Sequence, residues 1–180
     1  ASAIHAENSL IQEGLSARWY VQQNALQDQT IQNSEGDSNI SISGPVVTKY
    51  FGQEQALLLN REQNLLTIPY EPNSDVLPKQ AFSVEVWVNI EKTVEWGGII
   101  GAFQFNGGFQ KGWMLGFKQS NFVFCLSSKG SDDGDGKMTE IRTNQSLEWG
   151  RWYHLVATYD GFEMKLYVDG ELQKSSTDQT

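Results

Sequence analysis

The stretch that decides the fold runs from Trp149 to Gly170 and reads WGRWYHLVATYDGFEMKLYVDG. Residues 152–159 alternate between two sets of side chains, as in a half-buried strand. Asp160-Gly161 and Asp169-Gly170 are dipeptides that favour tight hairpin turns. The stretch therefore predicts three antiparallel strands joined by two turns. The alternation places Tyr153, Leu155, Ala157 and Tyr159 on one face of the first strand, and Phe162, Met164, Leu166 and Val168 on one face of the second.

The same alternation recurs upstream and is clearest over residues 82–90. Phe82, Val84, Val86, Val88 and Ile90 form one unbroken apolar face of that run. Residues 56–59 and 65–68 are predicted to pair as a hairpin. No long helical pattern accompanies these runs, so the sequence predicts an all-β chain. The remaining predicted strands are 15–21, 99–103, 113–117, 122–126 and 138–143.

Four motifs resemble, in order along the chain, the strands of a known family. They are ALLLN at residues 56–60, FSVEVWV at 82–88, WYHLVATYDG at 152–161 and LYVDG at 166–170. Together they resemble laminin-G-like domains of the concanavalin A-like lectin/glucanase superfamily, over residues 56–176. The resemblance implies a two-sheet antiparallel jelly-roll sandwich that is usually secreted and usually a binding module.

Length and composition favour one domain. A chain of 180 residues suits a single β-sandwich, predicted here over residues 15–180 after a polar tail at 1–14. Residues 22–43 are rich in Gln, Asn and Ser and are predicted to be a long polar connection with a short strand near Ile40 and Ile42.

The single Cys125 excludes an intrachain disulfide, and its apolar neighbours predict a small buried side chain in a strand.

The charge of the chain excludes some partners. A formal net charge of −9 argues against nucleic acid, because binding phosphates requires a basic stripe. It also argues against anionic membrane surfaces. No apolar run has the ~18–20 residues of a membrane span, so no membrane span is expected.

The sequence also argues against catalysis. Retaining glucanases need two carboxylates about 5.5 Å apart, which a strand provides from residues two apart. No predicted strand has that spacing: Glu85 stands between valines, and Glu163 and Asp169 are six residues apart. The resemblance makes His154 the hairpin histidine of the family, for which a structural hydrogen bond is expected. We therefore predict that the chain is not an enzyme.

An acidic glycine-rich segment is the candidate metal site. Asp132, Asp133 and Asp135 place three carboxylates within four residues, and Ca²⁺ prefers six to eight oxygen ligands. Many laminin-G-like domains bind calcium at a loop rim, which the resemblance extends to this segment. The alternative is a solvated hairpin tip without metal.

Aromatic residues beside glycines are the candidate ligand-binding site. Trp96 precedes Gly97-Gly98, while Phe105, Asn106 and Phe109 surround Gly107-Gly108. Aromatic faces exposed in such loops can stack on sugar rings, and the alternative is that they fold back onto the core. The tryptophans within strand patterns are expected in the core: Trp19, Trp87, Trp113 and Trp152.

Three functions remain open at this point. The first is a non-catalytic extracellular or cell-surface module that recognises a glycan or a protein. The second is a structural or assembly module of a larger surface or filament protein. The third is a targeting appendage of a secreted hydrolase.

The C-terminal end leaves two possibilities open, of which only the second makes assembly the function. Complete members of the resembled family continue with two further strands, which are missing after residues 175–180. The final strand of the family commonly lies beside an early strand. The run from Leu15 to Val21 is therefore expected to form a sheet edge, either in a fragment of a longer polypeptide or paired with a strand from another chain.

A melting experiment tests the calcium site. If Asp132, Asp133 and Asp135 bind Ca²⁺, millimolar calcium raises the melting temperature, because the ion binds only the folded chain. Replacing all three by Asn abolishes the rise. Unchanged melting of the wild-type chain with calcium or with a chelator would favour the solvated tip.

Overall fold

The protein is an all-β chain, as predicted. The computed structural model describes residues 14–21, 26–59, 64–69, 80–92, 94–127 and 136–178, and these contain strands but no helix. Accordingly, no helix long and apolar enough to cross a membrane occurs in the described part of the chain. The chain divides into two compact units, Ala1–Val76 and Leu77–Thr180, each described by itself below.

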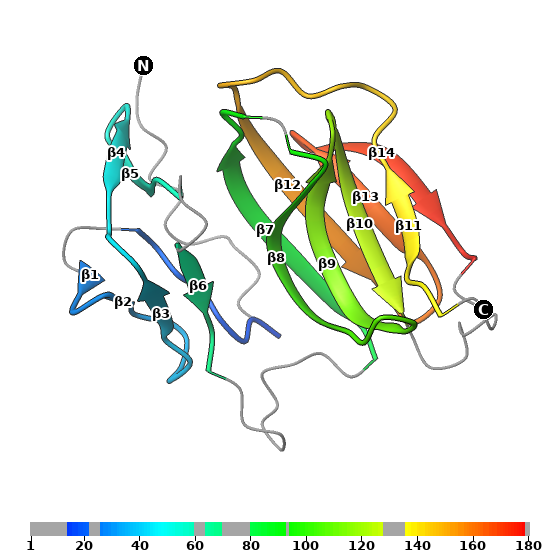
Figure 1. Cartoon of the computed structure of the whole chain (residues 1–180), viewed down its shortest axis with the longest axis horizontal. Coiled ribbons are helices and arrows are strands. Elements are labelled where there is room, and N and C mark those ends of the chain that lie inside the picture. Colours follow the sequence, from blue (N-terminus) through cyan, green and yellow to red (C-terminus); the bar gives the residue numbers. More distant parts are fainter. Residues whose placement is uncertain are drawn as a thin grey trace. The chain divides into compact units, whose positions relative to one another are not determined.

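The first unit is built from short strands (Figure 1). One antiparallel sheet has the order β1-β2-β3-β6, and β4 pairs with β5 in a separate ribbon. Ile31, Ile40 and Ile42 are buried at the centre of its small core. The bounds are β1 Leu26–Gln27, β2 Thr30–Ile31, β3 Ile40–Ser43, β4 Thr48–Phe51, β5 Glu54–Leu57 and β6 Leu65–Thr67.

The strand predicted over residues 15–21 is wrong. Only Trp19 forms a β-bridge, with Asn33. The ladder stops there because the N–H of Arg18 bonds to the side-chain Oδ1 of Asn33, at 2.9 Å, rather than to a backbone carbonyl. The expected sheet edge at Leu15 to Val21 is therefore not formed, and strand exchange with another chain stays a hypothesis.

The hairpin predicted from residues 56–59 and 65–68 is also wrong in its pairing. β5 pairs with β4 across a two-residue connection, and β6 pairs with β3. Closing the short connection costs little chain entropy. The other pairing places Leu66 opposite Ile42, which brings Leu66 to the isoleucine core.

The second unit is a sandwich of two four-stranded antiparallel sheets (Figure 1). We call the sheet β14-β13-β12-β7 the β12 sheet, and the sheet β11-β10-β9-β8 the β9 sheet. Every strand predicted between residues 82 and 175 is present. The bounds are β7 Phe82–Asn89, β8 Trp96–Phe105, β9 Gln110–Lys118, β10 Asn121–Ser127, β11 Thr139–Arg142, β12 Trp152–Tyr159, β13 Met164–Val168 and β14 Glu171–Ser176.

The two Asp-Gly turns differ. Asp169 and Gly170 both have positive φ, 51° and 83°, so β13 and β14 meet in the predicted two-residue turn. At the first turn only Gly161 has positive φ, and the Asp160 carboxylate accepts hydrogen bonds from the N–H groups of Phe162 and Glu163. These bonds hold the pKa of Asp160 below its usual range. Phe162 therefore lies in the turn, 59% exposed, and not on the predicted apolar face.

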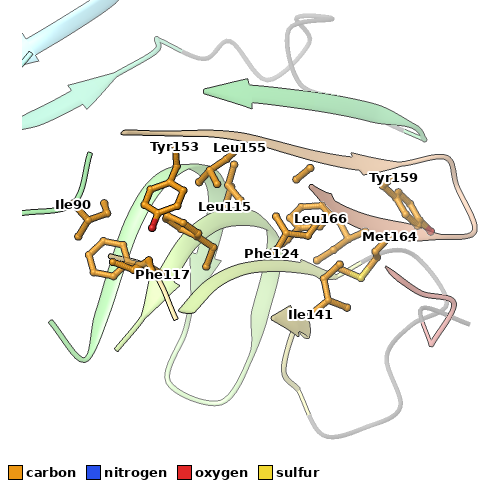
Figure 2. Packing of buried hydrophobic residues seen from close by; sticks show 14 residues of the cluster. Ile90, Leu115, Phe117, Phe124, Ile141, Tyr153, Leu155, Tyr159, Met164 and Leu166 are labelled. Atoms are coloured by element: carbon orange, nitrogen blue, oxygen red, sulfur yellow. The ribbon is translucent and has the colours of Figure 1, made fainter. Parts of the chain in front are cut away.

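The core lies between the two sheets of the second unit (Figure 2). Leu155 and Leu166 from the β12 sheet meet Leu115 and Phe124 from the β9 sheet, and all four are fully buried. Burying one such side chain contributes about 1.5–3 kcal/mol. The alternation read along residues 152–159 is confirmed, because Tyr153, Leu155, Ala157 and Tyr159 are all buried.

Cys125 is buried, as predicted. It lies on β10 beside Met114 and Val123, on the face of the β9 sheet opposite the main core. Burial raises the pKa of its thiol to about 12. A thiol that stays protonated at neutral pH is a poor nucleophile, so Cys125 serves packing.

Replacing Val86 by Asp tests the assignment of faces. Val86 packs against the core and stands opposite Leu155, so its carboxylate would enter an apolar interior. We expect Val86→Asp to lower the free energy of unfolding by roughly 3 kcal/mol, measured by urea denaturation. Ser83→Asp on the exposed face of the same strand is the control. Equal effects of the two changes would contradict the assignment.

Candidate functional site

The β8–β9 hairpin extends one end of the β9 sheet and carries most of the predicted site. Gln104 stands opposite Lys111, and Phe105 opposite Gln110. The N–H of Asn106 donates to the carbonyl of Phe109 at 3.0 Å and closes the turn. The sequence folds in this way because Gly107-Gly108 fits a tight turn between two β-forming runs.

The hairpin holds a hollow of about 300 Å³, lined by Gln104, Asn106, Phe109 and Lys111. We call it the hairpin hollow. Because cross-strand partners share a face and neighbours along a strand alternate, these residues lie on one side of the ribbon and Phe105 lies on the other. Asn106 and Phe109 therefore come together as predicted, whereas Phe105 does not join them. Phe105 and Phe109 are 63% and 57% exposed, so neither ring folds back onto the core.

The segment that leads into β11 braces the hairpin. The N–H of Gln110 donates to the carbonyl of Gly136 at 2.7 Å, and the side-chain Oε1 of Gln110 accepts from the N–H of Met138 at 3.2 Å. A Cβ at position 136 would lie 2.3 Å from the carbonyl oxygen of Gly108, so only glycine fits this contact. The hollow is therefore held by backbone contacts on two segments.

Trp96 lies away from the hairpin hollow. It begins β8 and pairs with Lys118, whereas Phe105 ends the same strand. At ~3.3 Å per residue, the strand separates Trp96 from Phe105 by roughly 30 Å. The Lys118 ammonium lies 4.3 Å from the centroid of the Trp96 ring, a cation–π contact. The four predicted ligand-binding residues therefore do not form one site.

The predicted metal ligands Asp132, Asp133 and Asp135 lie outside the described residues. Within the described ranges, no group of three His, Cys, Asp or Glu side chains could hold a metal ion. The calcium site stays a prediction.

The prediction that Trp87 lies in the core is wrong. It is 62% exposed on the outer face of the β12 sheet, opposite the face that carries Val86. Its ring stacks on the His154 imidazole, with 4.9 Å between centroids and 24° between planes. His154 Nε2 lies 2.9 Å from a carboxylate oxygen of Glu85. The structural hydrogen bond expected for His154 thus exists, on the surface of the sandwich.

The alternation along β7 could have indicated that Trp87 is exposed. Residues 83, 85, 87 and 89 share the face opposite the valines, and three of them are polar. A face of that composition is typical of a solvated side of an antiparallel sheet. The other tryptophans lie closer to the prediction: Trp113 packs against the main core, 5.0 Å from the Phe82 ring, Trp19 packs against the core of the first unit, and Trp152 is half-buried.

A second hollow, of about 220 Å³, lies at one end of the sandwich. Arg151 spans it with a hydrogen bond of 2.6 Å to Asp169, and the Tyr153 hydroxyl accepts from the N–H of Glu148 at 2.6 Å. The Arg151 guanidinium also lies 4.5 Å from the Tyr153 ring centroid. These polar groups satisfy one another, which is typical of a structural network.

The family model described as concanavalin A-like lectin/glucanases superfamily matches residues 62–180. Pappalysin-1 of Mus musculus and of Homo sapiens are each 30% identical over 114 residues, which cover 57% of this chain. The chain spans only 7% of either pappalysin.

Two solved structures share the fold. The binding domain of botulinum neurotoxin DC, in complex with rat synaptotagmin II, is 16% identical with a TM-score of 0.60, over 90% of this chain and 40% of that chain. Domain 4 of AbnA, an extracellular arabinanase from Geobacillus stearothermophilus, in complex with arabinotriose, is 19% identical with a TM-score of 0.55. That match covers 91% of this chain and 77% of the domain.

Proposed function

The chain belongs to the concanavalin A-like lectin/glucanase superfamily, and from that premise we propose that it is a non-catalytic extracellular module that binds glycans at the hairpin hollow. The observation that carries the proposal is the exposed Phe109 ring beside the side chains of Gln104, Asn106 and Lys111. A sugar presents an apolar C–H face and a rim of hydroxyls. The hollow offers a partner for each.

The polar residues suit hydroxyl groups. The amides of Gln104 and Asn106 can each donate and accept, and the Lys111 ammonium donates only. Phe109 supplies the apolar face against which a ring can stack. Ligand sites in proteins commonly combine such an apolar surface with a few placed polar groups, and about 300 Å³ lies at the lower end of their usual range.

The strands support a binding role rather than glycoside hydrolysis. None of the described strands carries two carboxylates two residues apart, the arrangement that would set two of them about 5.5 Å apart on one face. Glu85, the only carboxylate on β7, is bonded to His154.

The comparison with the arabinanase domain supports an extracellular location. The arabinanase that shares the fold is extracellular, and the matching part is one domain of it, solved in complex with arabinotriose. A surface or secreted location for this chain agrees with that relative and with its net charge of −9. Calcium at Asp132, Asp133 and Asp135 remains part of the proposal.

A targeting appendage of a hydrolase is the second candidate function. It is favoured by the match to a single domain of an arabinanase, because a module beside a catalytic domain concentrates that domain on its polymer. In this candidate function the module lies next to a catalytic domain, which the first candidate does not require. Both functions require glycan binding.

A glycan array with matched variants tests the proposal. We expect the wild-type chain to bind a defined set of glycans, and Phe109→Ala and Asn106→Ala to weaken that binding about tenfold, since each removes one half of the contact. Phe162→Ala is the control, because Phe162 is an equally exposed ring in a different turn. If Phe109→Ala and Asn106→Ala both bind glycans as tightly as the wild-type chain, the hairpin hollow is not the site. No binding to any glycan would overturn the function.

A further inference from the structure

We propose that Trp87, supported by His154 and Glu85, is a second carbohydrate-contacting site, which takes the apolar face of a sugar ring on the outer face of the β12 sheet. The proposal shares its ligand class with the proposed function, on which it rests, but it uses a different sheet. Trp87 lies on β7, an edge strand of that sheet within the described residues, directly opposite His154 on β12.

The packing of the second unit does not depend on the exposed Trp87 ring. Val86 and Val88 on either side pack against the core, so the strand is fixed without any contribution from the indole. At 62%, the Trp87 side chain is the most exposed of the six tryptophans. Removing a large exposed apolar ring from water is favourable, so a ligand that covers the Trp87 ring gains binding free energy.

The ring is held in a fixed orientation. One face stacks on the His154 imidazole, and His154 is bonded to Glu85 at 2.9 Å. The backbone N–H of His154 donates to Asp169 at 2.9 Å, and Asp169 is bonded in turn to Arg151. A ring ordered before binding loses little conformational entropy when a ligand covers its other face, which favours affinity.

The surroundings of Trp87 favour a sugar over a protein partner. Its neighbours on the same face along β7 are Glu85 and Asn89. Across the ladder His154 lies directly opposite, and the apolar Trp152 and Val156 lie diagonally opposite. Glu85, Asn89 and His154 all form hydrogen bonds. The core of a protein interface is depleted of charged residues and spans about 800 Å² on each partner. An exposed aromatic ring that has both hydrogen-bonding groups and apolar side chains beside it matches the mixed chemistry of a sugar residue instead.

Affinity electrophoresis in native gels containing arabinan, xylan, mixed-linkage β-glucan or galactomannan tests the inference. We expect at least one polysaccharide to retard the wild-type chain, and Trp87→Ala to raise its dissociation constant about tenfold. Trp87→Phe keeps a smaller aromatic face and should lose less than Trp87→Ala. Phe162→Ala is the control, and melting temperatures verify that each variant is folded.

The outcomes separate this inference from the hairpin hollow. Retardation lost in Trp87→Ala but kept in Phe109→Ala supports the Trp87 site and overturns the hollow. Retardation lost in Phe109→Ala but unchanged in both Trp87 variants overturns the Trp87 site and leaves the proposed function standing. A wild-type chain that no polysaccharide retards overturns both. Self-association in sedimentation that Trp87→Ala abolishes would make the surface a protein interface and overturn the inference as well.

Discussion

The two-residue period of β12 is the constraint on which the second unit depends. Leu155 and Ala157 point into the main core, and His154 and Val156 point the other way. The register with β7 extends this division, so that Val86 joins the core beside Leu155 while Trp87 joins His154 on the surface. A shift of one residue would exchange the two faces, so burying the core also fixes the surface. Both the stability of the sandwich and the position of the Trp87 ring follow from this one register.

Sequence reasoning reached the strands of the second unit and the division of each into two faces, because runs such as 82–90 and 152–159 are long enough to show alternation. In the first unit it found the short strand at Ile40 and Ile42 but not the strand pairing, because β1 and β2 are two residues each and no periodic pattern can set a pairing. It placed Trp87 on the correct side of β7 but treated that side as buried. That prediction relied on the hydrophobicity of tryptophan. The polar residues on the same face of β7 were the better indication that the face is exposed to solvent.

The candidate sites show the same limit at finer scale. Asn106 and Phe109 were predicted as ligand-binding residues and do line one hollow, while Phe105 lies across the ribbon and Trp96 at the far end of β8. Glycine content identified the turn, but only the cross-strand register assigns residues to its two sides. Both proposed sites pair one exposed aromatic ring with polar neighbours, with Phe109 in the turn between β8 and β9 and Trp87 on β7. That combination fits the proposed binding of glycans.

The exposure of Trp87 is the most direct measure of whether the register is right. The chain can be labelled with 5-fluorotryptophan, and its ¹⁹F signals assigned with Trp87→Phe and corresponding single replacements. A soluble paramagnetic agent then broadens each signal according to its exposure. The register predicts that the Trp87 signal broadens most among the six tryptophans and the Trp113 signal far less, because Trp113 packs against the core. A Trp87 signal protected as well as that of Trp113 would contradict the register and, with it, the surface site.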